Sequence, residues 1–281
     1  QALDMLLRLC VRPGDCVLLD SPCYFNFHAN LALQGAKIVT LERTHQGLDL
    51  KALEKTFIEQ RPVLYLTTSI LHNPTGHSFS PGQAYGVLEL AKRYNCHVIE
   101  DDLYGDLHPN PPPRLAALAG LEQVTYLSGF SKTLSANLRV SYVVAAPQLA
   151  ANLTQMKLMC GGITSELFEQ VLCSIHNDGS YHKHRKRIVQ GLLASGARVA
   201  GELQRLGFTL HGTYEGGLFI WATLPAGIDA QTLAQQALKH DVVLAPGTLF
   251  GFTPELRHAM RMNVAHSDTA RVMAALERLL V

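Results

Sequence analysis

Between residues 17 and 145, short apolar segments alternate with segments whose apolar residues recur at helical spacing, such as residues 81–95. The short segments are continuously apolar, which is typical of strands buried on both faces of a parallel sheet. The pattern predicts an α/β fold: a mostly parallel mixed sheet sandwiched by helices, with functional groups at the carboxyl ends of the strands. The predicted strands are VLLD (17–20), AKIVTLE (36–42), PVLYLTT (62–68), HVIEDD (97–102), VTYLSGF (124–130) and RVSYVVA (139–145).

The pattern changes after Gly161 and Gly162, where longer helical segments are followed by short strands. We interpret residues 1–178 as a large domain, and residues 179–281 as a connecting helix with a small C-terminal α+β domain. The first ten residues already have helical spacing, and no N-cap residue precedes them. We therefore expect the large domain to be N-terminally incomplete, as in a fragment or a processed form of a longer protein.

Composition narrows the class of protein. The 281 residues include 24 basic and 23 acidic ones, a formal net charge of +1 that gives no electrostatic case for nucleic acid or a membrane surface. Six cysteines occur without a C-x-x-C pair, which argues against a metal site and favours a reducing cytoplasm. No apolar run reaches the roughly 18–20 residues that cross a bilayer. We expect a cytoplasmic globular protein with no metal and no membrane partner.

The predicted strand at 124–130 leads directly into a lysine, in LSGFSKTLSANLR (127–139). Arg139 follows Lys132 by seven residues. A lysine amine held in a dry site loses proton affinity and forms Schiff bases with aldehydes. An arginine beside hydroxyl groups suits a phosphate. Taken alone, the segment is equally compatible with a solvated loop lysine.

Three carboxylates crowd the end of the predicted strand at 97–102, at Glu100, Asp101 and Asp102, and Tyr104 follows them. Adjacent carboxylates repel one another unless a cation meets them, either a metal or the protonated nitrogen of a heterocycle. Consecutive strand residues point to opposite faces, so only one of Asp101 and Asp102 readily faces a given pocket. A surface cluster that caps a helix is an equally good interpretation of this segment by itself.

Two further polar residues are unusual in their surroundings. Asn73 begins the turn signal N-P-T-G directly after the predicted strand at 62–68, where its amide is placed to donate to a ligand oxygen. Arg261 interrupts the apolar segment AMRMNVA (259–265), and a charge there needs an anion as partner. Neither segment decides alone, because N-P-T-G is also an ordinary turn and an internal salt bridge would satisfy the arginine.

Together and in order, the motifs P-x-Y, N-P-T-G, D-x-x-Y, S-K-x(6)-R and R-x-N resemble those of the fold type I pyridoxal-phosphate enzymes, the class I/II aminotransferases, and they span nearly the whole chain. The resemblance implies a fold type I PLP-transferase, with residues 1–178 as the PLP-binding domain and pyridoxal 5′-phosphate as the cofactor. It also implies a homodimer that exchanges amino groups between amino acids and 2-oxo acids.

The resemblance assigns the catalytic roles. Lys132 would hold the cofactor aldehyde as a Schiff base and, once released by substrate, carry a proton between the substrate α-carbon and the cofactor. Asp101 would keep the pyridine nitrogen protonated, with Asp102 turned away. Asn73 and Tyr104 would hydrogen-bond the phenolic oxygen of the ring.

The same resemblance assigns the binding roles. Tyr24 would stack on the ring, and Arg139 would clamp the phosphate. Arg261, with Asn73 beside it, would bind the substrate α-carboxylate, which answers the question of its anion.

Two departures from the family pattern concern the phosphate. The family usually has a serine three residues before the lysine, where this chain has Gly129. Ser128 and Ser131 lie on either side, and one of these hydroxyls would take over the contact. The glycine-containing turn that the family places before the helix beginning here at Gln1 is absent, as is the N-terminal segment that closes over the substrate.

A second resemblance concerns residues 164–187 (TSELFEQVLCSIHNDGSYHKHRKR), together with EGGLFIW (215–221) and VLAPGTLF (243–250). These segments are similar to the aminotransferase-like domain of GntR/MocR-type transcription regulators, which carry a winged-helix DNA-binding domain upstream. In that case the pocket would sense a cofactor or an amine, and DNA would be bound only by a domain outside this chain. We interpret the basic run at 182–187 as a solvated helix start rather than a DNA contact.

Overall fold

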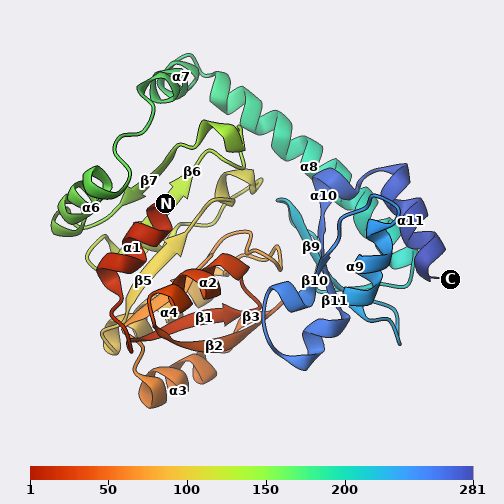
Figure 1. Cartoon of the computed structure of the whole chain (residues 1–281), viewed down its shortest axis with the longest axis horizontal. Coiled ribbons are helices and arrows are strands. Elements are labelled where there is room, and N and C mark those ends of the chain that lie inside the picture. The colour runs from red at the N-terminus through yellow and green to blue at the C-terminus, as the bar shows by residue number, and fades with distance from the viewer. Residues whose placement is uncertain (281) are drawn as a thin grey trace.

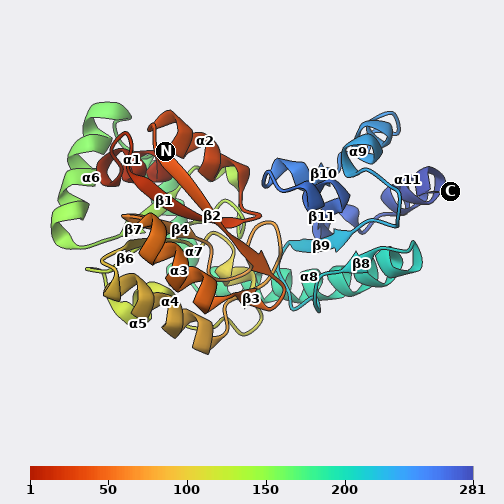
Figure 2. The same cartoon turned by 90° about the horizontal axis from the view of Figure 1, so that it is seen from below.

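The computed structural model describes residues 1–280 and contains two regions (Figure 1). We call the seven-stranded sheet with its helices the large region, and the four-stranded sheet with α8 (Ser180–Arg205) and the helices after it the small region. The long helix α8 leads from one region to the other, and the two lie side by side in both views (Figures 1 and 2). The boundary predicted at residues 178 and 179 falls in the turn between α7 (Glu166–Asn177) and α8.

The large sheet has the strand order β3-β2-β1-β4-β5-β6-β7. Strands β2, β1, β4, β5 and β6 are mutually parallel, and the edge strands β3 and β7 are antiparallel to their neighbours. The predicted mostly parallel mixed sheet is therefore confirmed. The strands are β1 (Cys16–Ser21), β2 (Lys37–Thr44), β3 (Gly47–Leu48), β4 (Leu64–Thr67), β5 (His97–Asp101), β6 (Val124–Gly129) and β7 (Ser141–Val144).

Helices cover both faces of this sheet, which explains why its strands are continuously apolar. On β1, Leu18 packs into one core, whereas Val17 and Leu19 pack into the core on the other face. Helix α4 begins at a capping box formed by Ser80 and Gln83. The first core is covered by α3 (Leu50–Gln60), α4 (Pro81–Arg93) and α5 (Leu115–Ala119), and the second by α1 (Ala2–Cys10), α2 (Phe25–Leu33) and α6 (Pro147–Cys160).

The small region is an antiparallel sheet of order β10-β11-β9-β8, packed on helices around a third core. Strand β10 is only two residues long. The elements are β8 (Thr209–Leu210), β9 (Phe219–Thr223), α9 (Ala230–Leu238), β10 (Ala245–Pro246), β11 (Ala259–Asn263), α10 (Val264–Ser267) and α11 (Ala270–Leu280), with short 3₁₀ helices at Gly105–Leu107, Ala136–Leu138, Gly247–Leu249 and Pro254–His258.

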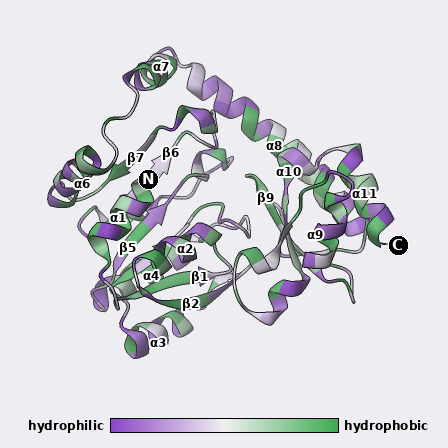
Figure 3. Ribbon diagram, in the orientation of Figure 1, coloured by the Kyte–Doolittle hydropathy of each residue, from purple (hydrophilic) through white to green (hydrophobic). Residues whose placement is uncertain are grey.

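The start of α8 is strongly polar, as its colouring shows (Figure 3). Our interpretation of this run as simply solvated was incomplete, because two of its side chains contact the large region. His184 Nε2 lies 3.0 Å from the carbonyl oxygen of Thr133, and Arg185 Nε donates to the carbonyl of Asp106 at 2.6 Å. The helix therefore fastens the small region to the loops after β5 and β6. Among residues 1–280, no helix combines the length and apolar character needed to span a bilayer.

Candidate active site

Three of the predicted residues follow neighbouring strands of the large sheet. Asn73 lies beyond the end of β4, Asp101 is the last residue of β5, and Lys132 follows β6. Because β4, β5 and β6 are parallel, their carboxyl ends lie at one edge of the sheet. Asn73, Asp101 and Lys132 are far apart along the chain but are brought to the same edge of the sheet.

The three crowded carboxylates have separate surroundings. Glu100 accepts hydrogen bonds from the backbone amides of Leu115 and Ala116 at 2.8 and 3.0 Å, so it caps the start of α5. Asp102 accepts from Arg114 Nε and Tyr126 Oη at 2.9 and 2.8 Å, and forms an ion pair with the arginine. Of the three, only Asp101 has a buried carboxylate oxygen without a hydrogen-bond partner among residues 1–280.

Asp101 is buried, and its Oδ1 atom has no hydrogen-bond partner within residues 1–280. The pKa of Asp101 is raised to about 7, chiefly by burial and also by the charge of Asp102, against the lowering effect of the Leu103 amide and of the charge of Lys132. A buried carboxylate without a partner is costly for a folded protein. It is therefore placed to receive a cationic group from a ligand.

Asn73 joins the two regions through its side chain. Its Nδ2 atom donates to the hydroxyl of Tyr104 at 3.2 Å, and its Oδ1 atom accepts from Arg261 Nη1 at 2.9 Å. Tyr104 is buried and packs edge-on against Phe219 with ring centroids 5.3 Å apart. Burial raises the pKa of the Tyr104 hydroxyl, so this phenol stays protonated near neutral pH.

Arg261 lies on β11, where it pairs in register with Trp221. Its guanidinium carbon is 4.4 Å from the centroid of Phe219 and 4.8 Å from that of Phe250, so aromatic rings replace a counter-ion. In the part of the chain that the structure describes, Arg261 has no carboxylate partner, and its Nε atom is buried without an acceptor. Burial lowers the pKa of Arg261. The internal salt bridge considered from the sequence does not form among these residues.

Tyr24 immediately precedes α2 and is half-buried. Asn26 Nδ2 donates to its hydroxyl at 2.9 Å. The charge of Tyr24 affects the pKa values of both Tyr104 and Arg261, so its phenol lies close to them. The aromatic ring predicted to stack on a ligand therefore borders the same cluster.

Lys132 differs from the expectation of a dry site, because its side chain is exposed. The loop that carries it is open to solvent, and Ser135, Ala136 and Asn137 are exposed as well. Its charge nevertheless lowers the pKa of Asp101.

The residues expected at the phosphate are less closely gathered. Arg139 is exposed, has a left-handed backbone with φ of 54°, and borders a hollow of about 260 Å³ that Gln1 at the start of α1 also lines. Ser128 already donates its hydroxyl hydrogen to the carbonyl of Asp102 at 2.8 Å. Ser131 is half-buried, which leaves its hydroxyl as the better placed of the two.

The irregular Gly129 has a packing reason. It pairs with Ser141 across β6 and β7, and a Cβ atom at this position would lie 2.9 Å from the Cβ of Ser141. A serine here would push the two strands apart. The close strand pairing therefore accounts for the glycine where the family usually has a serine.

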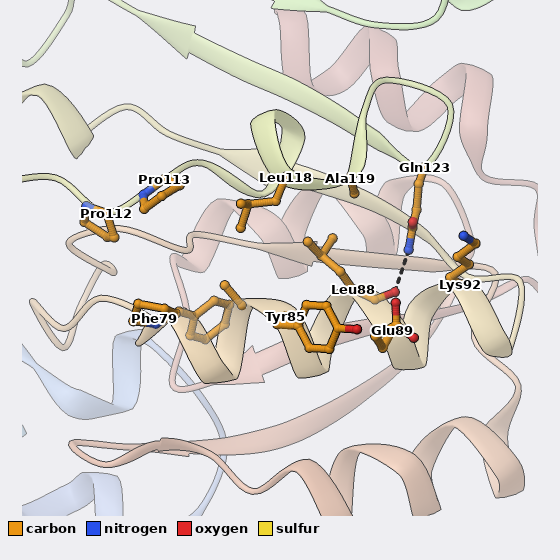
Figure 4. Close-up of a pocket in the computed structure, with 12 residues that line it drawn as sticks. Phe79, Tyr85, Leu88, Glu89, Lys92, Pro112, Pro113, Leu118, Ala119 and Gln123 are labelled. Atoms are coloured by element: carbon orange, nitrogen blue, oxygen red, sulfur yellow. Dashed lines mark hydrogen bonds between the residues drawn. The ribbon is translucent and has the colours of Figure 1, made fainter.

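A separate groove of about 390 Å³ runs along the outer side of α4 (Figure 4). Tyr85 and Leu88 line it from the helix, facing Pro113 and Leu118 on the segment opposite. None of the predicted site residues lines it. The groove is therefore distinct from the candidate active site.

Several residues around the site were missed from the sequence. Phe219 and Phe250 lie against the guanidinium of Arg261, although neither was predicted as a site residue. Asp20 and Arg43 form a buried ion pair behind Asn73. A signal for Asp20 was present, because it ends an apolar strand as Asp101 does.

This fold and this site define a class of protein: an α/β enzyme with a lysine, a buried carboxylate and an arginine without a counter-ion at the carboxyl edge of a parallel sheet. The family model "Aminotransferase class I and II" matches residues 1–279. The chain belongs to this family, and pyridoxal 5′-phosphate is its cofactor, as the resemblance predicted.

Relatives of two kinds are similar to the chain. It is 30% identical to the 2-aminoadipate transaminase of Thermus thermophilus, over 99% of this chain and 72% of that protein. The structure of the α-aminoadipate aminotransferase LysN from the same species, complexed with N-(5′-phosphopyridoxyl)-L-leucine, matches with a TM-score of 0.89 and 28% identity, covering 99% of this chain and 75% of that one. The chain is also 29% identical to the uncharacterized HTH-type transcriptional regulator YdcR of Escherichia coli, over 99% of this chain but 60% of the regulator.

The residues present fit the cofactor. The Oδ1 atom of Asp101, which is buried and has no partner in the described part of the chain, is the acceptor that a protonated pyridine nitrogen requires. The Asn73 amide and the Tyr104 hydroxyl are joined by a hydrogen bond beside it and carry donors suited to a phenolic oxygen. The exposed amine of Lys132 is accessible to an aldehyde.

Proposed function

We propose that this domain transfers the amino group of an amino acid to a 2-oxo acid through Lys132, which links covalently to the cofactor. When bound, pyridoxal phosphate supplies an aldehyde that condenses with amines and a ring that takes up carbanion charge. The observation that carries the proposal is the buried Asp101 Oδ1 atom, which has no hydrogen-bond partner within residues 1–280, next to the cluster of Asn73, Tyr104 and Arg261.

Each residue then has a chemical task. Lys132 would accept the proton from the substrate α-carbon and pass it to the bound cofactor. Asp101 keeps the ring nitrogen protonated, and its burial strengthens that interaction. Tyr104 and Asn73 orient the ring through its phenolic oxygen, and Tyr24 covers one face of the ring.

Substrate and phosphate are held by the outer residues. Arg261 binds the substrate α-carboxylate, with Asn73 holding the guanidinium in place by the 2.9 Å hydrogen bond. Arg139 and Ser131 bind the phosphate, while Ser128 keeps its hydrogen bond to the backbone. We also propose that the active form is a cytoplasmic homodimer, with residues 1–178 as the PLP-binding domain.

The test is spectroscopic. Protein loaded with pyridoxal phosphate is titrated with a panel of amino acids that includes 2-aminoadipate, because a relative bears that name. We expect the visible absorption band of the lysine-linked cofactor to shift with at least one of them. Product analysis by mass spectrometry separates amino transfer from elimination or decarboxylation, which the same lysine supports.

A lysine variant makes this test specific. Lys132→Ala should abolish the lysine-linked absorption band and all turnover, while thermal unfolding changes little because the side chain is exposed. Lys92→Ala, an exposed lysine on α4, is the matched control and should behave as wild type. An unchanged band in Lys132→Ala would refute the assignment.

A second function is favoured by the similarity to YdcR over 99% of the chain. In that case the same pocket senses the cofactor or an amine for a GntR/MocR-type regulator, and a winged-helix domain outside this chain binds DNA. The full reading frame and a DNA-binding assay with and without pyridoxal phosphate distinguish the two. If the full reading frame contains no DNA-binding domain, the regulator hypothesis is wrong.

A further inference from the structure

The loop that presents Asn73 is held from within the large region by a buried ion pair. Arg43 on β2 and Asp20 on β1 lie 3.0 Å apart, Nη1 to Oδ2, and their side chains are 0% and 1% exposed. Neither residue belongs to the cluster that faces the ligand. We call residues 68–77 the Asn73 loop.

Arg43 binds both stems of this loop. Its Nη1 atom donates to the carbonyl of Thr68 at 2.8 Å, and its Nη2 atom donates to the carbonyl of His77 at 3.2 Å. Asn73 lies between these two residues along the chain. The planar fork of one guanidinium therefore ties the ends of the loop together, which the single amine of a lysine does not reproduce.

Asp20 holds the fork in place. Thr67 Oγ1 donates to Asp20 Oδ2 at 2.7 Å, and the Tyr65 hydroxyl donates to Oδ1 at 2.5 Å. His72 Nε2 lies 3.5 Å from Asp20 Oδ2, and its Nδ1 atom pairs with Thr75 Oγ1 at 2.8 Å. The network thus reaches the residues before and after Asn73.

The small region approaches the same loop. Gly76 has a φ of 76°, and a Cβ atom built there would lie 2.5 Å from the carbonyl oxygen of Phe219. His77 Nε2 lies 2.5 Å from the carbonyl oxygen of His211. The loop is therefore packed between the two regions, and a shift of its stems moves Asn73 relative to Arg261.

A buried ion pair is poor evidence for added stability, because apolar residues of similar size often serve as well. Among residues 1–280, the Nε atom of Arg43 even has no acceptor, and its guanidinium carbon lies 4.2 Å from the centroid of the Phe79 ring. What the ion pair contributes here is the geometry of the Asn73 loop. We propose that Arg43, fixed by Asp20, is a positioning residue that sets Asn73 for its hydrogen bonds to Tyr104 and Arg261. This inference rests on the proposed function.

The experiment compares Arg43→Met and Arg43→Lys with Asn73→Ala in the full chain. The lysine variant keeps the positive charge beside Asp20 but loses the double bridge between the stems. We expect it to lower kcat/KM by about tenfold to 100-fold, since small misplacements of positioned groups have effects of that order. Arg43→Lys combined with Asn73→Ala should lose no more than Asn73→Ala alone.

Two measurements distinguish a positioning role of Arg43 from a general loss of protein stability. The pH midpoint of the visible absorption of bound pyridoxal phosphate should move in the same direction in Arg43→Lys, Arg43→Met and Asn73→Ala. Hydrogen exchange of the amides at 72–77 should rise about tenfold in the Arg43 variants, because their local protection depends on the stems. Leu53→Ala, which removes a buried side chain from the same core without touching these hydrogen bonds, is the control.

The outcomes divide cleanly. Independent, additive losses in Arg43→Lys and Asn73→Ala, or loop exchange no faster than in Leu53→Ala, overturn the inference. If Arg43→Met does not fold, the lysine variant decides. If the wild-type chain binds no pyridoxal phosphate, the proposed function fails, and the exchange measurement alone then decides whether Arg43 positions the loop.

Discussion

Two arginines hold the neighbourhood of Asn73, the buried Arg43 from the large region and the half-buried Arg261 from the small region, and they differ in their counter-ions. Arg43 in the large region pairs with Asp20 and binds backbone carbonyls. Arg261 in the small region has two aromatic rings and the Asn73 amide, but no carboxylate partner among residues 1–280. Arg43 therefore has its counter-ion within the protein, whereas the guanidinium of Arg261 can take an anionic group of a ligand as its counter-ion.

The neighbouring carboxylates repeat this contrast. Asp102 is paired with Arg114 and Tyr126, whereas the Oδ1 atom of Asp101 has no partner in the described chain. Because an unpaired buried charge is costly, a fold retains one where a ligand supplies the missing partner. Among residues 1–280, Asp101 Oδ1 lacks a partner and the guanidinium of Arg261 lacks a carboxylate, which suits a ligand with a cationic ring and an anionic substrate group.

Among the aspartate and arginine variants, Asp101→Asn should cause the largest loss of turnover. The amide keeps the shape of the carboxylate but does not hold a proton on the ring nitrogen, so turnover should fall on the order of 10³-fold while the cofactor still binds. Steady-state kinetics with a cofactor titration checks this. A loss of less than about tenfold would mean that Asp101 is not the partner of the ring.

Replacing each of the two arginines by methionine should change the free energy of unfolding by different amounts. Arg43→Met leaves Asp20 buried without its cation and should reduce the free energy of unfolding by about 3–5 kcal/mol. Arg261→Met strands no carboxylate and should change it by less than about 1 kcal/mol, while raising KM for the amino acid. Urea unfolding of the cofactor-free proteins measures both. Equal losses in the two variants would contradict the contrast.

The free energy of unfolding should also depend on pH through Asp101. The pKa of Asp101 is raised from 3.8 in the unfolded chain to about 7 in the folded one, so the folded state holds a proton that the unfolded state has released. The stability that this proton contributes is fully present below about pH 4 and is lost as the pH rises through about 7, at about 1.4 kcal/mol per pH unit.

Asp101→Asn is the matched control for that measurement. The buried histidines, whose pKa values are lowered by burial, act with the opposite sign in both proteins and cancel in the difference. Cofactor-free wild type should therefore lose stability relative to the variant as the pH increases from about 5 to about 7. Parallel stability curves would mean that the folded pKa of Asp101 is ordinary.

Much of the fold was predictable because its signals are local. Continuous apolar strands require cover on both faces, and Leu18 packs on one face while Val17 and Leu19 pack on the other. The motifs around Asn73, Asp101 and Lys132 were visible because each follows a predicted strand. Parallel strands bring their carboxyl ends together, so order along the chain was enough to predict a common site.

The exposure of Lys132 was not predictable, because it depends on which segments cover the loop rather than on the neighbours of the lysine in sequence. The same is true of Gly129. Its lack of a side chain is explained only by the approach of Ser141 across the antiparallel pair of β6 and β7.

By itself, the sequence determined the α/β architecture and indicated which residues are candidates for the chemistry, because periodicity and strand ends are short-range properties. Only the tertiary structure decided which charges are paired. Arg43 meets Asp20 because β1 and β2 lie in parallel register, and Arg261 meets Asn73, 188 positions away, because the two regions pack against each other. Charge pairing is a property of distances in space, and no local pattern contains them.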